Sequence, residues 1–412
     1  MVLYLENKSR SLVVSRSEIV LSIWILGGKR ITILHSVSFL AAVTCASNHL
    51  ISHKELAGPM KPSVYLVTRI RQSSVCALIA ILSFLSAPLT ALSQQTRVSD
   101  NDPGLHHLAG EVSRLAEHAL GTVGVAAYHL ETGRWMTMNG EERFPMASTY
   151  KVPIATQILA MVDQGDLALT DMIEIEQEDV YLTSSAISDL LDDPGVQLSI
   201  HNLLELMLQI SDNIATDILF EIAGGAEEIT GRMVEVGADG IRVDRTTWAL
   251  IANWLGRDDV TVANRIYPDE YRALLETELA NGYAGSDNAA FNADPQDTAT
   301  PLAMAQLLRK IWDQEILSEE SSSLLIDIMY RCQTGEARLK GALPPGTQVA
   351  HKTGTIGETT NDVGIIDLPD GAGHVITVVY IKESKLPDNP AMEPVIANIA
   401  RAIHDYFTFN RG

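Results

Sequence analysis

Three short motifs contain the side chains that can do chemistry, S-T-Y-K at 148–151, S-D-N at 211–213 and K-T-G at 352–354. A helical pattern begins at the first motif, so Ser148 and Lys151 lie three residues apart on one predicted helix face. A lysine can take a serine proton when burial and a nearby cation lower its pKa, and Lys352 supplies such a cation. The first motif therefore predicts a serine nucleophile with a lysine base, near helix N–H groups that suit an oxyanion.

The second motif offers groups for proton transfer and substrate binding. The Ser211 hydroxyl can relay a proton to a leaving nitrogen, and the Asn213 amide can hold a substrate carbonyl or the Lys151 ammonium. Asp212, between them, is expected to tie the loop down. The residues from Ile214 onward look helical, so an ordinary helix cap is the alternative interpretation of this motif.

The third motif follows the β-forming residues 348–351, which places it on a strand. Lys352 and the Thr353 hydroxyl can bind a carboxylate, and Gly354 lets a substrate approach the backbone closely. The N–H of Thr355 would complete an oxyanion hole. A strand-end turn is the alternative for this motif alone, but the three motifs together, in this order, are specific.

Hydrophobic periodicity indicates the elements that must position these motifs. Apolar residues recur at helical spacing over 105–120, β-forming residues follow over 122–130, and strands return before a last helix over 390–406. We therefore expect an α+β fold, an antiparallel sheet flanked by helices plus an all-helical lobe, with the site in the cleft. The expected lobes are a sheet lobe from 105–147 and 341–412 and a helical lobe from 148–340.

Together the motifs resemble the penicillin-recognising serine hydrolases, and among them the class A β-lactamases, over residues 105–412. Residues 297–301 are similar to the segment that closes the family's Ω loop. The resemblance implies a β-lactam as the small-molecule substrate and hydrolysis through an acyl-enzyme on Ser148. Residues 333–338 resemble the stretch before K-T-G, which implies that Arg338 helps to hold the substrate carboxylate.

The resemblance also implies a base that activates the water releasing the acyl group, a glutamate of the Ω loop in class A enzymes. An ungapped comparison from S-D-N puts Arg245 on the family's loop arginine and Thr247 on the glutamate. If the insertion in this segment comes earlier, Glu276 matches instead, and Glu276 is our candidate base. The alternative is a surface glutamate, and Glu278 carries the same ambiguity.

Because the ungapped comparison places a threonine where the family has its glutamate, other functions are open. Without a water-activating group the acyl-enzyme would persist, as in a penicillin-binding protein-like D-Ala-D-Ala peptidase or an acylated β-lactam sensor. A carboxylesterase using the same serine and lysine is a further alternative. Flanking similarity to class A favours hydrolysis.

The charge balance separates an N-terminal region from the rest. Thirty Lys and Arg against 52 Asp and Glu give a net charge of −22, which argues against nucleic acid as a partner. A basic stretch, an apolar run over 75–89 and small residues at 91–93 predict a signal peptide at 60–93, hence a periplasmic or secreted protein and no other membrane association. The alternative is an uncleaved anchor. Residues 1–59 would be a gene-model extension and residues 94–104 a linker.

Cysteine and histidine usage argues against a disulfide scaffold and a metal site. The three cysteines are Cys45, Cys76 and Cys332, and the first two lie in the N-terminal region. Cys332 is then expected to be a small hydrophobe. His106 and His107 are adjacent on a predicted helix, and neither metal-ligand spacing nor a glycine-rich phosphate loop occurs. We expect no metal, no cofactor and a monomer.

Overall fold

The computed structural model describes residues 19–25, 29–35, 95–99, 102–257, 269–280 and 288–411. The chain divides into two units, Met1–Leu89 and Thr90–Gly412. In the first unit, β1 (Ile19–Ile25) and β2 (Lys29–His35) pair in antiparallel register, with Ile19 opposite His35. The signal peptide predicted at 60–93 lies outside the described residues.

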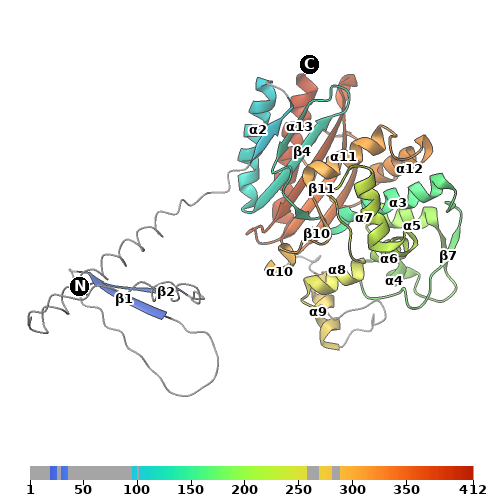
Figure 1. The fold of residues 1–412 in the computed structure, drawn as a ribbon, viewed down its shortest axis with the longest axis horizontal. Coiled ribbons are helices and arrows are strands. Elements are labelled where there is room, and N and C mark those ends of the chain that lie inside the picture. The colour runs from blue at the N-terminus through green and yellow to red at the C-terminus, as the bar shows by residue number, and fades with distance from the viewer. Residues whose placement is uncertain are drawn as a thin grey trace, which may run out of the picture. The chain divides into compact units, whose positions relative to one another are not determined.

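The second unit is built on a six-stranded sheet in which each neighbouring pair is antiparallel. In spatial order its strands are β10 (Val349–Ile356), β11 (Thr359–Leu368), β12 (Gly373–Lys382), β4 (Thr122–His129), β5 (Trp135–Met138) and β3 (Thr96–Val98). Nine of the ten residues of β11 are buried, because helices cover both faces of the sheet. The predicted α+β architecture is confirmed (Figure 1).

The expected linker at 94–104 is wrong in part, because this segment contains the edge strand of the sheet. β3 pairs with β5, placing Thr96 opposite Met138. Asp102 then caps the next helix by accepting from the backbone N–H of Gly104 and Leu105. The segment therefore belongs to the folded unit.

Two helices from opposite ends of the second unit cover one face of the sheet. They are α2 (Pro103–Ala116), which runs into the short 3-10 helix η1 (Glu117–Ala119), and α13 (Asn389–Phe409). The two pack against each other (Figure 1), and α2 contacts β5 whereas α13 contacts β11 and β12. Val379 faces this side of the sheet and Val378 the other, as strand geometry requires.

The other face packs against α11 (Pro301–Trp312) and the helical lobe. Thr300 caps α11 by accepting from the N–H of Ala303, and Pro301 occupies the first helical position, as the Thr-Pro pair predicts. α11 contacts both β4 and β12, so it joins the lobe to the sheet.

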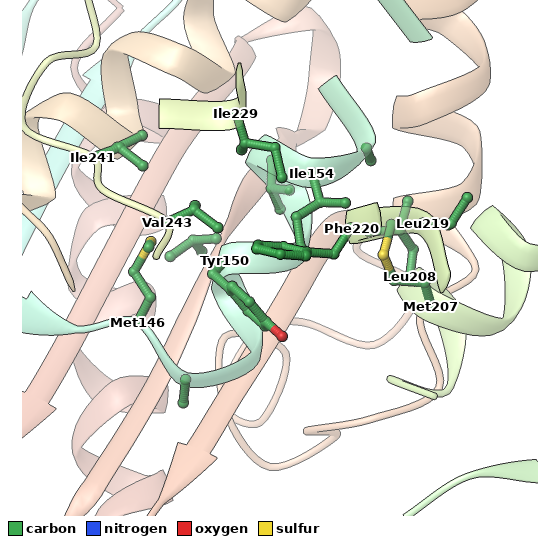
Figure 2. Packing of buried hydrophobic residues seen from close by; sticks show 14 of the residues in the cluster. Met146, Tyr150, Ile154, Met207, Leu208, Leu219, Phe220, Ile229, Ile241 and Val243 are labelled. Atoms are coloured by element: carbon green, nitrogen blue, oxygen red, sulfur yellow. The ribbon is translucent and has the colours of Figure 1, made fainter. Parts of the chain in front are cut away.

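The helical lobe surrounds a single large apolar core. Figure 2 shows part of this core, with Ile154, Leu208, Phe220 and Ile229 contributed by four different helices. The further elements are β6 (Phe144–Pro145), η2 (Ala147–Tyr150), α3 (Lys151–Gln164), β7 (Met172–Glu174), α4 (Ala186–Leu190), β8 (Gln197–Ser199), α5 (Ile200–Gln209), α6 (Asn213–Ile222), α7 (Gly225–Glu235), α8 (Thr247–Trp254), α9 (Asp269–Ala280), α10 (Ala289–Asn292), β9 (Thr298–Ala299), α12 (Glu319–Tyr330) and η4 (Pro369–Gly371).

Over the described part of the chain, no helix has the length and apolarity needed to cross a bilayer.

Candidate active site

Ser148 lies in a constrained turn between β6 and α3. Ala147, just before it, has φ of 46°, and the 3-10 turn of η2 leads directly into α3. The side-chain amide of Asn361 on β11 donates to the carbonyl oxygens of Pro145 and Met146, at 2.9 and 3.0 Å. The sheet therefore fixes the turn that carries the half-buried Ser148.

Lys151, three residues later, is fully buried and points at the S-D-N motif. Its Nζ donates to the Ser211 carbonyl at 2.7 Å, to Ser211 Oγ at 3.1 Å and to Asn213 Oδ1 at 2.9 Å. Burial, with the nearby charge of Lys352, lowers the pKa of Lys151 well below its ordinary value. This is the environment that a lysine needs to act as a base.

The S-D-N motif forms a strained loop before α6. Ser211 has φ of 62°, a conformation that costs free energy for a residue other than glycine. Asp212 holds the loop by accepting from Ser185 Oγ at 2.8 Å and from the N–H of Ala215 at 2.9 Å, as expected. The motif is therefore both a helix cap and a set of site residues.

Lys352 completes the contact between the two lobes. Its Nζ donates to Ser211 Oγ and to the Thr353 carbonyl, both at 3.0 Å. Burial lowers the pKa of Lys352 to about 8. Ser211 Oγ thus lies between the side chains of Lys151 and Lys352, which is the position of a proton relay.

Gly354 allows the strand to pack against the serine turn. A Cβ atom at this position would lie 2.4 Å from the Met146 carbonyl oxygen, a backbone atom that cannot move aside. Only glycine fits there, so β10 and η2 are in direct contact. This contact brings Thr353 and Thr355 to the cavity that contains Ser148.

The site is a cavity of about 200 Å³ between the sheet and the helical lobe. The described residues that line it come from all three motifs, from α8, from residue 184 and from residues 334–338: Ala147, Ser148, Tyr150, Ser184, Ile210, Ser211, Asn213, Thr247, Leu250, Ile251, Thr334, Gly335, Arg338, Thr353, Thr355 and Ile356. No carboxylate is present in this set. Lys151 and Lys352 lie directly behind it, through their contacts with Ser211.

Arg338 lines the cavity, but its donors are engaged within the protein. Its guanidinium pairs with Glu393 at 3.1 Å and donates to Thr355 Oγ1 at 2.7 Å. It also donates to the carbonyl oxygens of Gly354 and Asn361. Arg338 therefore supports the end of β10, and its contact with a substrate carboxylate stays a prediction.

The candidate base Glu276 does not lie in the cavity. It is exposed on α9, whereas Leu275 and Glu278, three residues apart, face inward on that helix. Neither glutamate is among the described lining residues. Thr247, which the ungapped comparison places at the position of the family's glutamate, does line the cavity. The choice of Glu276 depended on where an insertion was placed, and the structure does not bring this side chain to the described lining of the cavity.

The segment that carries Thr247 is held by two ion pairs of the buried Arg245. Arg245 binds Asp297 at 2.5 Å and Asp294 at 3.1 Å. Asp297 also accepts from the backbone N–H of Asp244 and Arg245. These bonds fix the start of α8 at the edge of the cavity.

Two groups near the site escaped sequence reasoning. Asp217 on α6 accepts from the N–H of Thr247, and no motif marks it. Cys332, His351 and Asp362 form a buried set in which His351 Nδ1 lies 2.9 Å from an Asp362 oxygen. The position of His351 next to K-T-G was the one available signal. No cluster able to hold a metal ion occurs among the residues described here.

The fold and the site together are those of a serine hydrolase. The profile of the "Beta-lactamase enzyme family" matches residues 107–407. Beta-lactamase VEB-1 of Pseudomonas aeruginosa is 30% identical over 69% of this chain and 85% of its own length. Extended-spectrum beta-lactamase PER-1 of the same organism is 30% identical over 69% of this chain and 82% of its own length.

Solved structures agree with these relatives. A β-lactamase from Chitinophaga pinensis DSM 2588 has 31% identity and a TM-score of 0.59, covering 73% of this chain and 98% of that one. The TLA-1 extended spectrum β-lactamase has 28% identity and a TM-score of 0.61, covering 74% and 99%. The chain therefore belongs to the β-lactamase enzyme family, and the predicted resemblance to class A is confirmed.

Proposed function

We propose that the protein hydrolyses the β-lactam amide through an acyl-enzyme on Ser148. The observation that carries this proposal is the hydrogen-bonded chain from Lys151 Nζ through Ser211 Oγ to Lys352 Nζ, beside the cavity that contains Ser148. Nothing else in the described chain places a lysine base, a proton relay and a cation together at a serine.

Acylation begins when neutral Lys151 takes the Ser148 proton and Ser148 Oγ attacks the lactam carbonyl carbon. The backbone N–H groups of Ser148 and Thr355 stabilise the oxyanion. The carbon–nitrogen bond then breaks, and the proton passes from Lys151 through Ser211 to the leaving nitrogen. The lowered pKa of Lys151 keeps a useful fraction of its amine neutral.

The substrate carboxylate is assigned to the K-T-G side of the cavity. Lys352 is cationic below a pH of about 8, and the Thr353 hydroxyl lines the cavity beside it. Thr334 Oγ1 holds that hydroxyl at 2.6 Å. A charge-assisted bond to Lys352 would thus orient the lactam ring.

Intact-protein mass spectrometry after mixing with excess penicillin or cephalosporin tests this function. We expect an adduct of one β-lactam that forms and then disappears as product accumulates. Ser148→Ala should form none. Ser113→Ala, which removes a hydroxyl on α2 that donates to Met138 Sδ and not to any motif residue, is the matched control and should behave as the parent. An adduct on Ser148→Ala, or loss of turnover with a chelator, would contradict the proposal.

A second candidate is a penicillin-binding protein-like peptidase or an acylated sensor. It is favoured by one observation, the threonine in place of a carboxylate at position 247. The same time course separates the candidates, because a stoichiometric burst without a steady state indicates the second. Turnover of a D-Ala-D-Ala peptide or a simple ester, compared with penicillin, identifies the leaving group.

We also propose that the protein is exported by a signal peptide at 60–93 and acts in the periplasm or outside the cell. The basic, apolar and small-residue order of this segment supports the proposal. N-terminal sequencing of the exported protein should begin at Gln94. Residues upstream of Gln94 in that protein would indicate an uncleaved anchor.

A further inference from the structure

None of the described residues that line the cavity is a carboxylate that could activate water for release of the acyl group. Thr247 lines the cavity at the position that corresponds to the family's glutamate. A threonine hydroxyl alone is too weak a base to take a proton from water. Its environment therefore decides whether this position can accept a proton. Two neighbours matter, one on each side of the hydroxyl.

The first neighbour is Asp217, which lies behind Thr247 and is 2% exposed. Its carboxylate accepts from the N–H of Thr247 at 2.5 Å and of Trp248 at 3.1 Å, and from Tyr181 Oη at 2.7 Å. Burial raises the pKa of Asp217, although these donors and the Thr247 hydroxyl lower it. Asp217 is thus a buried carboxylate more basic than usual, one residue away from the cavity.

The second neighbour is Tyr150, whose Oη lies 2.5 Å from Thr247 Oγ1. Burial and the charge of Asp217 raise the pKa of Tyr150 well above its ordinary value, so Tyr150 keeps its proton. A threonine hydroxyl has one donor and two acceptor lone pairs. With Tyr150 donating to one lone pair, the Thr247 proton is free to point at Asp217, and the other lone pair can accept from water in the cavity.

We propose that Asp217 is the proton acceptor for release of the acyl group and that it acts through the Thr247 hydroxyl. This inference rests on the acyl-enzyme of the proposed function. A water in the cavity gives its proton to Thr247 Oγ1 while Thr247 gives its own to Asp217, and the hydroxide oxygen bonds to the acyl carbon. The bond to Ser148 Oγ then breaks, the proton on Asp217 returns along the same route to Ser148, and the released acid loses a proton to solvent.

The competing base is Lys151, which already makes three hydrogen bonds to the S-D-N loop. Lys151 is also the base that the proposed acylation uses, so it is the alternative from which the Thr247 route must be distinguished. Thr247, by contrast, belongs to α8 and lines the cavity directly. The two routes predict different variants to be slow, so they can be separated.

The test uses the full chain and follows acylation and acyl release separately by mass spectrometry with penicillin. Thr247→Val removes only the hydroxyl and keeps both backbone bonds to Asp217. We expect it to acylate at the parental rate within a few-fold and to release the acyl group about 10² to 10⁴ times more slowly. Thr247→Ser should restore release, and Asp217→Asn should match Thr247→Val.

Thr156→Val is the matched control, because Thr156 is a buried threonine whose hydroxyl bonds to the Val152 carbonyl of its own helix. It should release the acyl group at the parental rate. If Thr247→Val releases the acyl group at the parental rate, the relay is overturned and Lys151 is indicated as the base. If Asp217→Asn fails to fold, the result for Thr247→Val alone decides between the two routes. A parent that acylates and never releases also overturns the relay but leaves acylation intact, whereas absence of any adduct rejects the proposed function itself.

Discussion

The Arg245 cluster gives a quantitative prediction about the segment that carries Thr247. Arg245→Ala removes a guanidinium that is 8% exposed and binds Asp297, which is 1% exposed, at 2.5 Å. Asp297 then keeps only backbone donors in a buried site. Breaking a buried pair in this way costs about 3–5 kcal/mol of unfolding free energy. At about 2–4 °C per kcal/mol, the Tm should fall by about 6–20 °C.

Urea unfolding followed by tryptophan fluorescence measures this loss. Arg401→Ala is the matched control, because Arg401 pairs with Asp405 on the surface of α13 and an exposed pair contributes about 1 kcal/mol or less. Burial already raises the pKa of Asp297, and loss of the arginine charge raises it further, so the deficit of Arg245→Ala should shrink as the pH falls. The reasoning is refuted if the two arginine variants lose equal stability at neutral pH.

Three further predictions concern the site. The acylation rate should fall as the pH rises through about 8, because the Lys352 ammonium loses its proton there; a flat profile up to pH 10 would show that its charge is not needed. Gly354→Ala should lose most acylation, because its Cβ would meet the Met146 carbonyl, whereas Gly110→Ala, with open space on α2, should not. Burial raises the pKa of the Cys332 thiol, but His351 and then Lys352 bring it down to about 6. Because Cys332 is buried, alkylation of the folded protein should still be slower than that of the unfolded chain, and equal rates would contradict its burial.

Much of the fold could be predicted because local signals agreed with the final packing. The Thr-Pro pair at 300–301 marks the start of α11, and it does so through a cap bond and the fixed backbone of proline. The β-forming residues over 122–130 predicted β4, and the return of strands before the last helix predicted β12. The two sides of these strands face different cores. The site motifs were visible for the same reason, since each is a short run of neighbouring residues.

What sequence reasoning missed depends on contacts between distant segments. β3 has three residues and two are exposed, so no hydrophobic pattern separates it from a linker. His351 meets Asp362 only because β10 and β11 pair in a register that places Lys352 opposite Val363. In the sequence, Asp217 is not distinguished from other polar residues on helices. Its role is visible only in the structure, where it accepts from the backbone N–H groups at the start of α8. Glu276 was chosen because the sequence around it matches a family motif, whereas the structure places it on the exposed side of α9.

The Asn361 side chain has a consequence for how the molecule responds to heat or denaturant. Besides holding the serine turn, its Oδ1 accepts from the Ile381 N–H of β12 at 3.2 Å, so a single amide connects the nucleophile to the middle of the sheet. The turn should therefore exchange its amide hydrogens as slowly as the central strands do. Partial melting of the helical lobe would scatter the lysine base and the S-D-N loop first, and it would leave an aligned but inert serine.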